Sequence, residues 1–295
     1  MTPPPSNMLC AELAVSGLAP QPNALLAWHP RLSLDRPLLI VLFFHGREFD
    51  PQSFAWTIHE LPDQIRAAEK NAVVIAPTMR MTTPVDGTKG SVVTGYLDTH
   101  DRIATLLRRG LDAVRRRLGG AADDAWTSRA IGNARLLLAP YSNGYLAWQA
   151  AMKTLRSARP GTSTEVAPPA VIGHSAFDCL YWETPLMRGV DRHGPAEEAR
   201  FSPKGRALLD TAFVTTHFTQ GNPTLEKQSR YLDAMIAHDP SLLRHDEIPP
   251  RLGPLDIVRT VAPIADHDLA VSHDFVLSRV VAAVPGFDLP AVPVS

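Results

Sequence analysis

The chain has 295 residues, 45% of them hydrophobic, which is enough apolar sequence to bury the core of a large α/β domain. Its 29 Lys and Arg residues balance 30 Asp and Glu residues, so the composition excludes a strongly basic surface of the kind that binds nucleic acid or an anionic membrane. No apolar run approaches the roughly 20 residues of a membrane-spanning helix.

The cysteine content and the N-terminal residues indicate the compartment. Cys10 and Cys179 are the only cysteines, and they lie far apart without the spacing of metal ligands. Residues 1–7 have neither the basic stretch nor the long apolar stretch of a secretory signal peptide. We therefore expect a soluble, cytoplasmic protein with reduced cysteines and no metal site.

The N-terminal part of the chain predicts four strands and one helix. Residues 10–15 and 24–29 flank a proline-containing turn and are expected to form a β-hairpin. The continuous apolar runs at residues 37–44 and 71–77 are typical of strands that are covered on both faces. Between these runs, residues 53–70 carry apolar side chains at helical spacing.

The middle of the chain predicts a long loop followed by helices and strands. Residues 78–99 lack periodicity and contain several glycines, and long loops of this kind tend to carry function. Residues 101–118 predict an amphipathic helix. The apolar run at residues 135–139 predicts a strand, and residues 144–155 predict the helix that follows it.

The C-terminal part continues the alternation of strands and helices. Residues 169–174 form another apolar run, and the irregular, polar residues 178–205 are expected to form a small cap or excursion. Further elements are expected as strands within residues 207–216 and at 255–261, and as helices within residues 225–237 and at 275–284. No linker divides the chain, so we expect a single domain over residues 1–295. This order predicts an α/β fold, a three-layer sandwich with a mostly parallel sheet between two layers of helices.

Ser142 occupies the sequence pattern of a nucleophile elbow. The predicted strand stops at Pro140, Ser142 stands two residues later, and Gly144 allows a sharp turn into a helix. The usual form of this motif is G-x-S-x-G, and here Pro140 replaces the first glycine. The alternative interpretation is a serine in an ordinary loop between strand and helix. Ser175 also follows an apolar run, but it lacks both the closing glycine and a good helix after it.

A nucleophilic serine needs donors for the oxyanion, and they are expected at the carboxyl end of a neighbouring strand. The apolar run that begins at residue 37 ends in the sequence Phe44-His45-Gly46-Arg47. Glycine lets the backbone turn there, so the amide of Gly46 or Arg47, together with that of Asn143, is the candidate oxyanion hole. The alternative is a plain turn at the end of a strand.

The base and the acid of a serine site must also lie near strand ends. His267 and His273 are both candidates for the base, and His273 is preferred because it stands directly before a predicted helix. Asp178 is the preferred acid because it follows the strand at residues 169–174 closely, whereas the alternative, Glu226, lies farther from the preceding strand. Each histidine could instead be a surface residue, and Asp178 could be a helix cap.

From about residue 37 to 284 the chain resembles the α/β-hydrolase superfamily, closest to its serine esterase-like members. The resemblance rests on the order of strands, on a late histidine, and on short matches. These matches are Phe44-His45-Gly46, Tyr141-Ser142-Asn143-Gly144-Tyr145, Asp178-Cys179-Leu180-Tyr181 and Ser272-His273-Asp274. The superfamily implies a roughly eight-stranded, mostly parallel sheet and the chain order serine, acid, histidine, which Ser142, Asp178 and His273 obey. Pro140 departs from the pattern of the elbow.

The leading hypothesis is therefore a serine hydrolase that cleaves a small-molecule carboxylic ester, in preference to an amide, through an acyl-enzyme intermediate. This chemistry requires neither a metal nor an organic cofactor. Two alternatives are a non-catalytic binding protein with the same fold and an acyltransferase that uses the same triad. The sequence makes no prediction of an oligomeric state.

Overall fold

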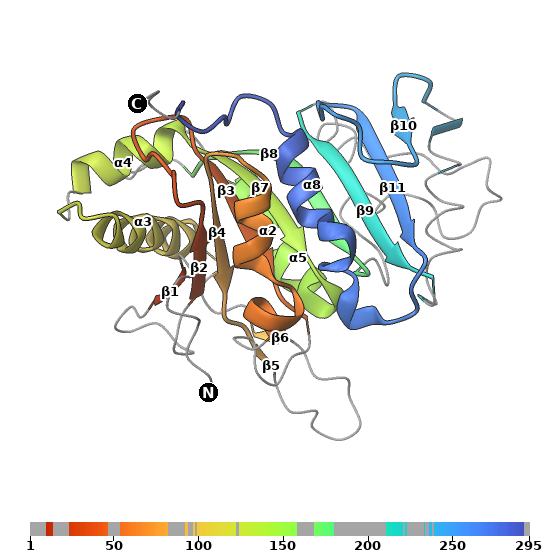
Figure 1. The fold of residues 1–295 in the computed structure, drawn as a ribbon, viewed down its shortest axis with the longest axis horizontal. Helices are drawn as coiled ribbons and strands as arrows, with labels where there is room; N and C mark the ends of the chain where they lie inside the picture. Colours follow the sequence, from red (N-terminus) through yellow and green to blue (C-terminus); the bar gives the residue numbers. More distant parts are fainter. Residues whose placement is uncertain are drawn as a thin grey trace.

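The structure, a computed structural model, is dominated by one large twisted sheet with helices on both faces (Figure 1). The part of the chain that it describes comprises residues 10–13, 24–46, 54–81, 92–93, 97, 99–121, 124–157, 168–179, 211–220, 222, 233, 236–237 and 239–291. Among these residues, no helix is both long and apolar enough to cross a membrane.

The large sheet has nine strands within the described residues, in the order β1-β2-β4-β3-β7-β8-β9-β11-β10. The strands are β1 (Cys10–Leu13), β2 (Ala24–Trp28), β3 (Leu39–Phe44), β4 (Ala72–Pro77), β7 (Arg135–Pro140), β8 (Ala170–Phe177), β9 (Phe213–Thr219), β10 (Leu243–His245) and β11 (Asp256–Ala262). β2 pairs antiparallel with β1 and with β4, and every other neighbouring pair is parallel. The expectation of a mostly parallel sheet that begins with a hairpin is therefore confirmed.

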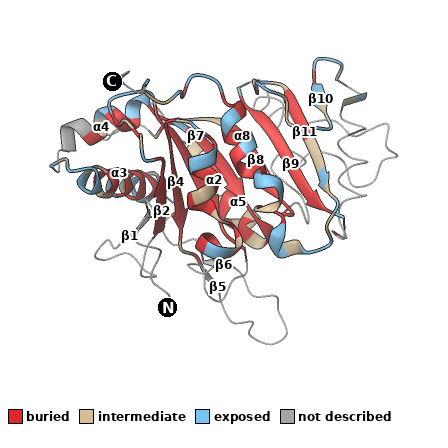
Figure 2. Ribbon diagram, viewed as in Figure 1, coloured by how far each residue is buried: buried red, intermediate tan, exposed pale blue. Residues whose placement is uncertain are grey.

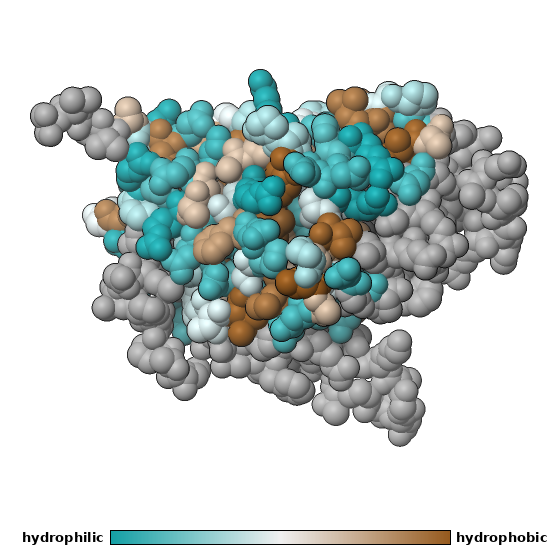
Figure 3. All heavy atoms as spheres, turned by 45° about the vertical axis from the view of Figure 1, so that its right-hand side comes forward, coloured by the Kyte–Doolittle hydropathy of each residue, from teal (hydrophilic) through white to brown (hydrophobic). Residues whose placement is uncertain are grey.

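The strands β3, β4 and β9 are buried along their whole length, whereas the helices expose their outer sides (Figure 2). On the face that Figure 3 shows, hydrophilic residues lie between separate hydrophobic clusters. Within the described residues, the exposed large hydrophobic side chains are Leu118, Leu243, Val261, Leu269 and Phe275. The continuous apolar runs of the sequence are thus explained by strands that helices cover on both faces.

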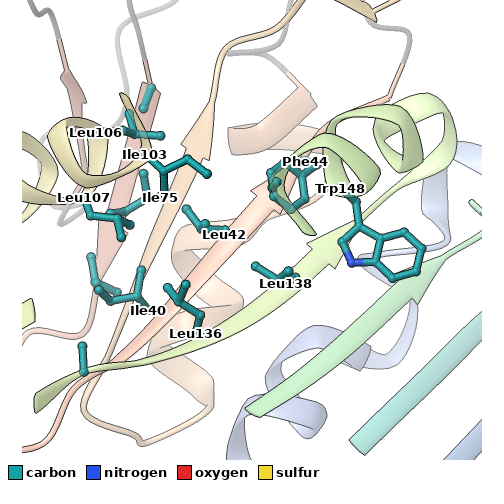
Figure 4. Close-up of a cluster of buried hydrophobic side chains, with 14 of the residues drawn as sticks. Ile40, Leu42, Phe44, Ile75, Ile103, Leu106, Leu107, Leu136, Leu138 and Trp148 are labelled. Carbon is teal, nitrogen blue, oxygen red and sulfur yellow. The ribbon is translucent and has the colours of Figure 1, made fainter. Parts of the chain in front are cut away.

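Two separate cores lie on the two faces of the sheet. The helices are α2 (Leu61–Ala67), α3 (His100–Arg117), α4 (Asp124–Asn133), α5 (Tyr145–Ser157) and α8 (Val276–Ala283). One core joins α3, α4 and α5 to alternate strand residues. Figure 4 shows part of it, where residues of α3 and α5 pack near strand residues such as Ile40 and Leu42. The other joins α2 and α8 to the residues between them, such as Val41. The predicted three-layer sandwich is therefore confirmed.

Several local elements differ from the sequence prediction. The helix expected over residues 53–70 is broken into a short π-helical turn, η1 (Phe54–Ile58), and α2. Glu60, between η1 and α2, has the left-handed φ of 50°, which interrupts the helix. Pro62 lies in the first turn of α2, where proline is tolerated because the N–H group that it lacks would have no partner within the helix. The segment expected to be a loop contains the two-stranded sheet of β5 (Arg80–Met81) and β6 (Val92–Val93). α4 and β10 are additional elements that the sequence analysis did not predict.

Charged residues surround β10, the strand at one edge of the sheet. Arg244 on β10 lies 2.6 Å from Asp233 and 3.1 Å from Asp246. Arg259 on the neighbouring β11 lies 3.7 Å and 3.5 Å from the same two carboxylates. A network of ion pairs therefore lies at this edge of the sheet.

Most of the helix expected at residues 225–237 lies outside the described residues.

Candidate active site

Ser142 lies at a sharp turn between β7 and α5. Tyr141 is still extended, with φ −120° and ψ 136°, whereas Ser142 has the left-handed φ of 49°. The turn η2 (Ser142–Gly144) then leads directly into α5, and the Gly144 amide donates a hydrogen bond of 2.8 Å to the Tyr141 carbonyl. A serine held in this strained conformation between a strand and a helix has the geometry of a nucleophile elbow.

Two glycines allow the end of β3 to approach this turn. A Cβ atom on Gly144 would lie 2.1 Å from the Phe44 carbonyl oxygen, so only glycine fits. A Cβ atom on Gly46 would lie 2.8 Å from the Cβ of Ser142. The expected neighbourhood of Ser142 and the end of β3 is therefore present in the structure.

Pro140 fits into the strand despite the glycine expected at this position. The Tyr141 amide donates to the Phe44 carbonyl on β3, so the nitrogen of Pro140 faces the other neighbour, β8. The regular pairing of β7 with β8 ends at Leu138 and resumes only as an isolated bridge at Tyr141. The N–H group that proline lacks would therefore lie where β7 and β8 are not regularly paired, so no hydrogen bond between these strands is lost.

Asp178 is fully buried directly after β8 and has the left-handed φ of 45°. Its Oδ1 accepts hydrogen bonds of 2.8 Å from the Thr219 amide and from Asn222 Nδ2. Its Oδ2 accepts from Thr219 Oγ1 at 2.5 Å and from His267 Nδ1 at 3.0 Å. Burial alone would raise the pKa of Asp178, but the hydrogen bonds from His267, Thr219 and Asn222 outweigh it and lower the pKa. The carboxylate is thus stabilised in its charged form.

The structure pairs Asp178 with His267 and not with His273. His267 opens the short turn η4 (His267–Leu269), which follows β11, and its side chain is 37% exposed. His273 opens the next turn, η5 (His273–Phe275), where its Nδ1 lies 3.5 Å from the exposed carboxylate of Asp274. The expected pairing with His273 is therefore not formed. β11 lies beside β9, and the chain leaving β11 reaches Asp178 at His267, before it arrives at His273.

Tyr141 connects the elbow to the turn that carries His267. The two rings stack with centroids 5.0 Å apart and an interplanar angle of 27°. The phenol oxygen lies 3.2 Å from the His267 carbonyl oxygen and 3.1 Å from Asp268 Oδ1. The residue directly before Ser142 therefore contacts the histidine that Asp178 holds.

His45 fixes the backbone at the end of β3. Its Nδ1 donates a hydrogen bond of 2.9 Å to the Gly46 carbonyl, and its Nε2 accepts one of 2.9 Å from the Met79 amide. Asn143, the other candidate oxyanion donor, is half-buried in η2. Arg47, Glu226 and all of the expected cap at residues 178–205 except Asp178 and Cys179 lie outside the described residues.

The competing serine, Ser175, lies inside β8 and not in a turn. It is fully buried, and Thr215 Oγ1 donates a hydrogen bond of 2.8 Å to its Oγ.

Three residues near the site were not predicted from the sequence: Thr219, Asn222 and Tyr141. Thr219 and Asn222 could have been found as polar residues at the carboxyl end of a strand. Tyr141 belongs to the elbow match, but nothing in the sequence marks it as a neighbour of His267. No group of three or more His, Cys, Asp or Glu side chains within the described range is arranged to hold a metal ion.

His217 on β9 is a buried histidine whose carbonyl accepts a hydrogen bond of 2.8 Å from the Asp178 amide. Its ring stacks on Phe177 with centroids 4.9 Å apart, and its two nitrogens lie 2.7 Å from Thr260 Oγ1 and 2.9 Å from Thr215 Oγ1. Burial, together with the charge of Arg279, lowers the pKa of His217 from 6.5 to about 3. The folded protein therefore holds this imidazole neutral.

His217 should make folding stability depend on pH between about 6.5 and 3. In this range the unfolded chain binds a proton that the folded chain does not, so the free energy of unfolding falls as the pH falls. One proton gives a slope of at most about 1.4 kcal/mol per pH unit. Urea unfolding from pH 7 to 4 should show a flatter dependence for His217→Gln than for the wild type. Parallel curves would contradict the assignment of a neutral, buried His217.

Comparisons with known proteins found similarity only at the level of structure. A search with protein-family models found no match, and a search of curated protein sequences found no match. A serine-to-alanine mutant of the feruloyl esterase module from Clostridium thermocellum, complexed with sinapinate, is similar with a TM-score of 0.53 and 12% identity, over 99% of this chain and 93% of that chain. An α/β serine hydrolase without lid from Xanthomonas campestris has a TM-score of 0.38 and 13% identity, over 88% of this chain and 85% of that chain. At such identities the likeness to the feruloyl esterase module concerns the fold alone.

Proposed function

The chain has the α/β-hydrolase fold, and from this fold and the site on it we propose a serine hydrolase that cleaves carboxylic esters through an acyl-enzyme intermediate. In this proposal Ser142 is the nucleophile, His267 the general base and Asp178 the residue that orients the base. The observation that carries the proposal is the hydrogen bond of 3.0 Å from His267 Nδ1 to the buried carboxylate of Asp178. With the proton on Nδ1, the lone pair of the imidazole is on Nε2, which is the nitrogen that can accept the proton of a hydroxyl.

The contacts of Tyr141 support the proposal that Ser142 and His267 act together as nucleophile and base. Tyr141 precedes Ser142 in the chain, and its ring stacks on His267 with centroids 5.0 Å apart. Ser142 lies shortly before the start of α5 and has the left-handed backbone conformation of a nucleophile elbow, which lifts the serine side chain above the end of the strand. In this proposal the nucleophile, the acid and the base follow the carboxyl ends of β7, β8 and β11, and α/β folds bind their ligands at this edge of the sheet.

In the proposed reaction, Ser142 Oγ attacks the ester carbonyl carbon while His267 Nε2 takes its proton. The backbone amides of Gly46 or Arg47 and of Asn143 stabilise the oxyanion of the tetrahedral intermediate. The protonated His267 then gives the proton to the leaving alcohol, which departs and leaves the acyl group on Ser142. His267 next takes a proton from water, whose oxygen attacks the acyl carbon, and returns that proton to Ser142 as the acid is released.

An ester is proposed as the substrate for a chemical reason and because of the likeness of folds. An alkoxide leaves a tetrahedral intermediate more easily than an unprotonated amide nitrogen, which would have to leave as an amide anion. An ester therefore places the smaller demand on the general acid. The protein compared above that shares this fold is named a feruloyl esterase module. The substrate class to test first is therefore a small carboxylic ester.

A fluorophosphonate probe tests the proposal, because it reacts covalently with an activated serine and not with an ordinary hydroxyl. Mass spectrometry of the folded wild-type protein should find one added group, on the peptide that contains Ser142. Ser142→Ala should remain unlabelled, and Ser175→Ala, which removes the competing serine, should still be labelled. An unlabelled wild-type protein with an intact circular dichroism spectrum would reject the proposal and favour the binding protein.

A further inference from the structure

Tyr141 offers two kinds of contact to the segment that carries His267. The first is a stacked ring, with centroids 5.0 Å apart. The second is the phenol oxygen, which lies 3.2 Å from the His267 carbonyl oxygen and 3.1 Å from Asp268 Oδ1. Tyr141 is only 2% exposed, so these contacts form in an environment from which water is nearly excluded.

The Tyr141 ring has little freedom to move away from His267. It also makes an edge contact with the ring of His59, with centroids 4.5 Å apart and an interplanar angle of 68°. His59 in turn packs against Phe43 of β3, with centroids 5.4 Å apart. The position of Tyr141 is therefore set by the core and by its own place at the end of β7, and not by the turn that it contacts.

The turn η4 is short, and its two backbone hydrogen bonds are longer than usual. The Leu269 amide donates to the Asp266 carbonyl at 3.3 Å, and the Ala270 amide donates to the His267 carbonyl at 3.2 Å. The Asp268 amide donates to Asp266 Oδ1 at 3.0 Å. A phenol hydroxyl carries one proton, so Tyr141 donates either to the His267 carbonyl or to Asp268, and either bond ties this turn to the core.

We infer that Tyr141 is a positioning residue, whose ring and hydroxyl hold the His267 imidazole in line between Asp178 and Ser142. This inference rests on the proposed function, because it needs His267 to be the base. The hydrogen bond to Asp178 holds the ring at Nδ1, and a single hydrogen bond permits rotation about its own axis. The face of Tyr141 removes this freedom, and the hydroxyl fixes the backbone from which the imidazole extends.

The experiment is Tyr141→Phe, which keeps the ring and removes only the hydroxyl. kcat/KM is measured for p-nitrophenyl acetate and for ethyl acetate, because it reports the acylation step. A misaligned His267 is a poorer base for both esters, but only the ethoxide leaving group also needs it as a proton donor. We expect a loss of about tenfold for the p-nitrophenyl ester and about a hundredfold for the ethyl ester, in the range that displaced catalytic groups give.

Thr154→Val is the matched control, because it also removes one buried hydroxyl that donates to a backbone carbonyl, that of Leu97 at 2.9 Å. Thr154 lies on α5 about 14 Å beyond Tyr145, far from the site. The two variants should lose similar amounts of stability in urea unfolding, while Thr154→Val keeps wild-type kcat/KM for both esters.

Unchanged kcat/KM in Tyr141→Phe would overturn the inference, and so would an equal loss for both esters. His267→Ala, measured in the same assays, separates this failure from that of the proposed function. If His267→Ala is inactive and Tyr141→Phe is not impaired, only the role of Tyr141 is rejected. If His267→Ala is as active as the wild type, the proposed function itself is rejected.

Discussion

His267→Ala is expected to lower kcat for an ester by about 10⁶-fold, the order of loss that follows removal of the base from a serine triad. Ser142 keeps its hydroxyl in this variant but has no group to accept its proton. The variant should still fold, because Thr219 and Asn222 continue to donate hydrogen bonds to both oxygens of Asp178. The measurements are steady-state kinetics with p-nitrophenyl acetate and circular dichroism of the same preparation.

His273→Ala is the matched control for this variant. His273 also opens a short turn in the segment after β11, and it too lies near a carboxylate, that of Asp274. Its replacement should leave kcat and KM close to those of the wild type, because it has no contact with Asp178 among those that the structure describes. The reverse result, an inactive His273→Ala and an active His267→Ala, would transfer the role of base to His273.

Gly144→Ala is expected to lower the free energy of unfolding by about 3 kcal/mol or more. The new Cβ atom would lie 2.1 Å from the Phe44 carbonyl oxygen and 2.8 Å from that of His45. Both are backbone atoms, so no side chain can rotate to make room, and either the end of β3 or the elbow has to move. The displacement of Ser142 should also abolish ester hydrolysis. Urea unfolding and the esterase assay measure the two effects.

Gly132→Ala provides the control with the opposite sign. Gly132 is an exposed residue of α4, and a Cβ atom there would meet no atom within 4 Å in the described part of the chain. Alanine in a helix is more stable than glycine by roughly 0.5–1 kcal/mol, so this variant should be slightly stabilised. Equal stability of the two variants would show that the elbow tolerates a side chain at Gly144.

The sequence predicted those parts of the fold that follow from local hydrophobic patterns. The apolar runs that became β3, β4 and β7 could be assigned because helices bury both faces of these strands. The helix that became α3 was equally clear from its periodicity. β10 was missed because its three residues are exposed or half-buried and carry no apolar signal. The broken helix before β4 was missed because apolar spacing continues across the break at Glu60.

The sequence predicted only those residues of the candidate site that lie close behind the end of a strand. Ser142 comes two residues after one strand and Asp178 directly after another, so the sequence could propose both. The choice between His267 and His273 depends on how far the chain travels from β11 before it meets Asp178, which is a property of the packed sheet. Tyr141 could not be identified at all, since its role depends on a histidine more than a hundred residues later.

The ion pairs around β10 have a consequence for contacts between molecules. An open sheet edge can pair with a strand of another chain through its free N–H and C=O groups, which leads to aggregation. β10 is only three residues long, and Arg244 on it is engaged with Asp233 and Asp246. An incoming strand would find few backbone groups to bind and would have to displace these charges. Among the residues that the structure describes, β10 thus makes its own edge of the sheet a poor site for intermolecular strand addition.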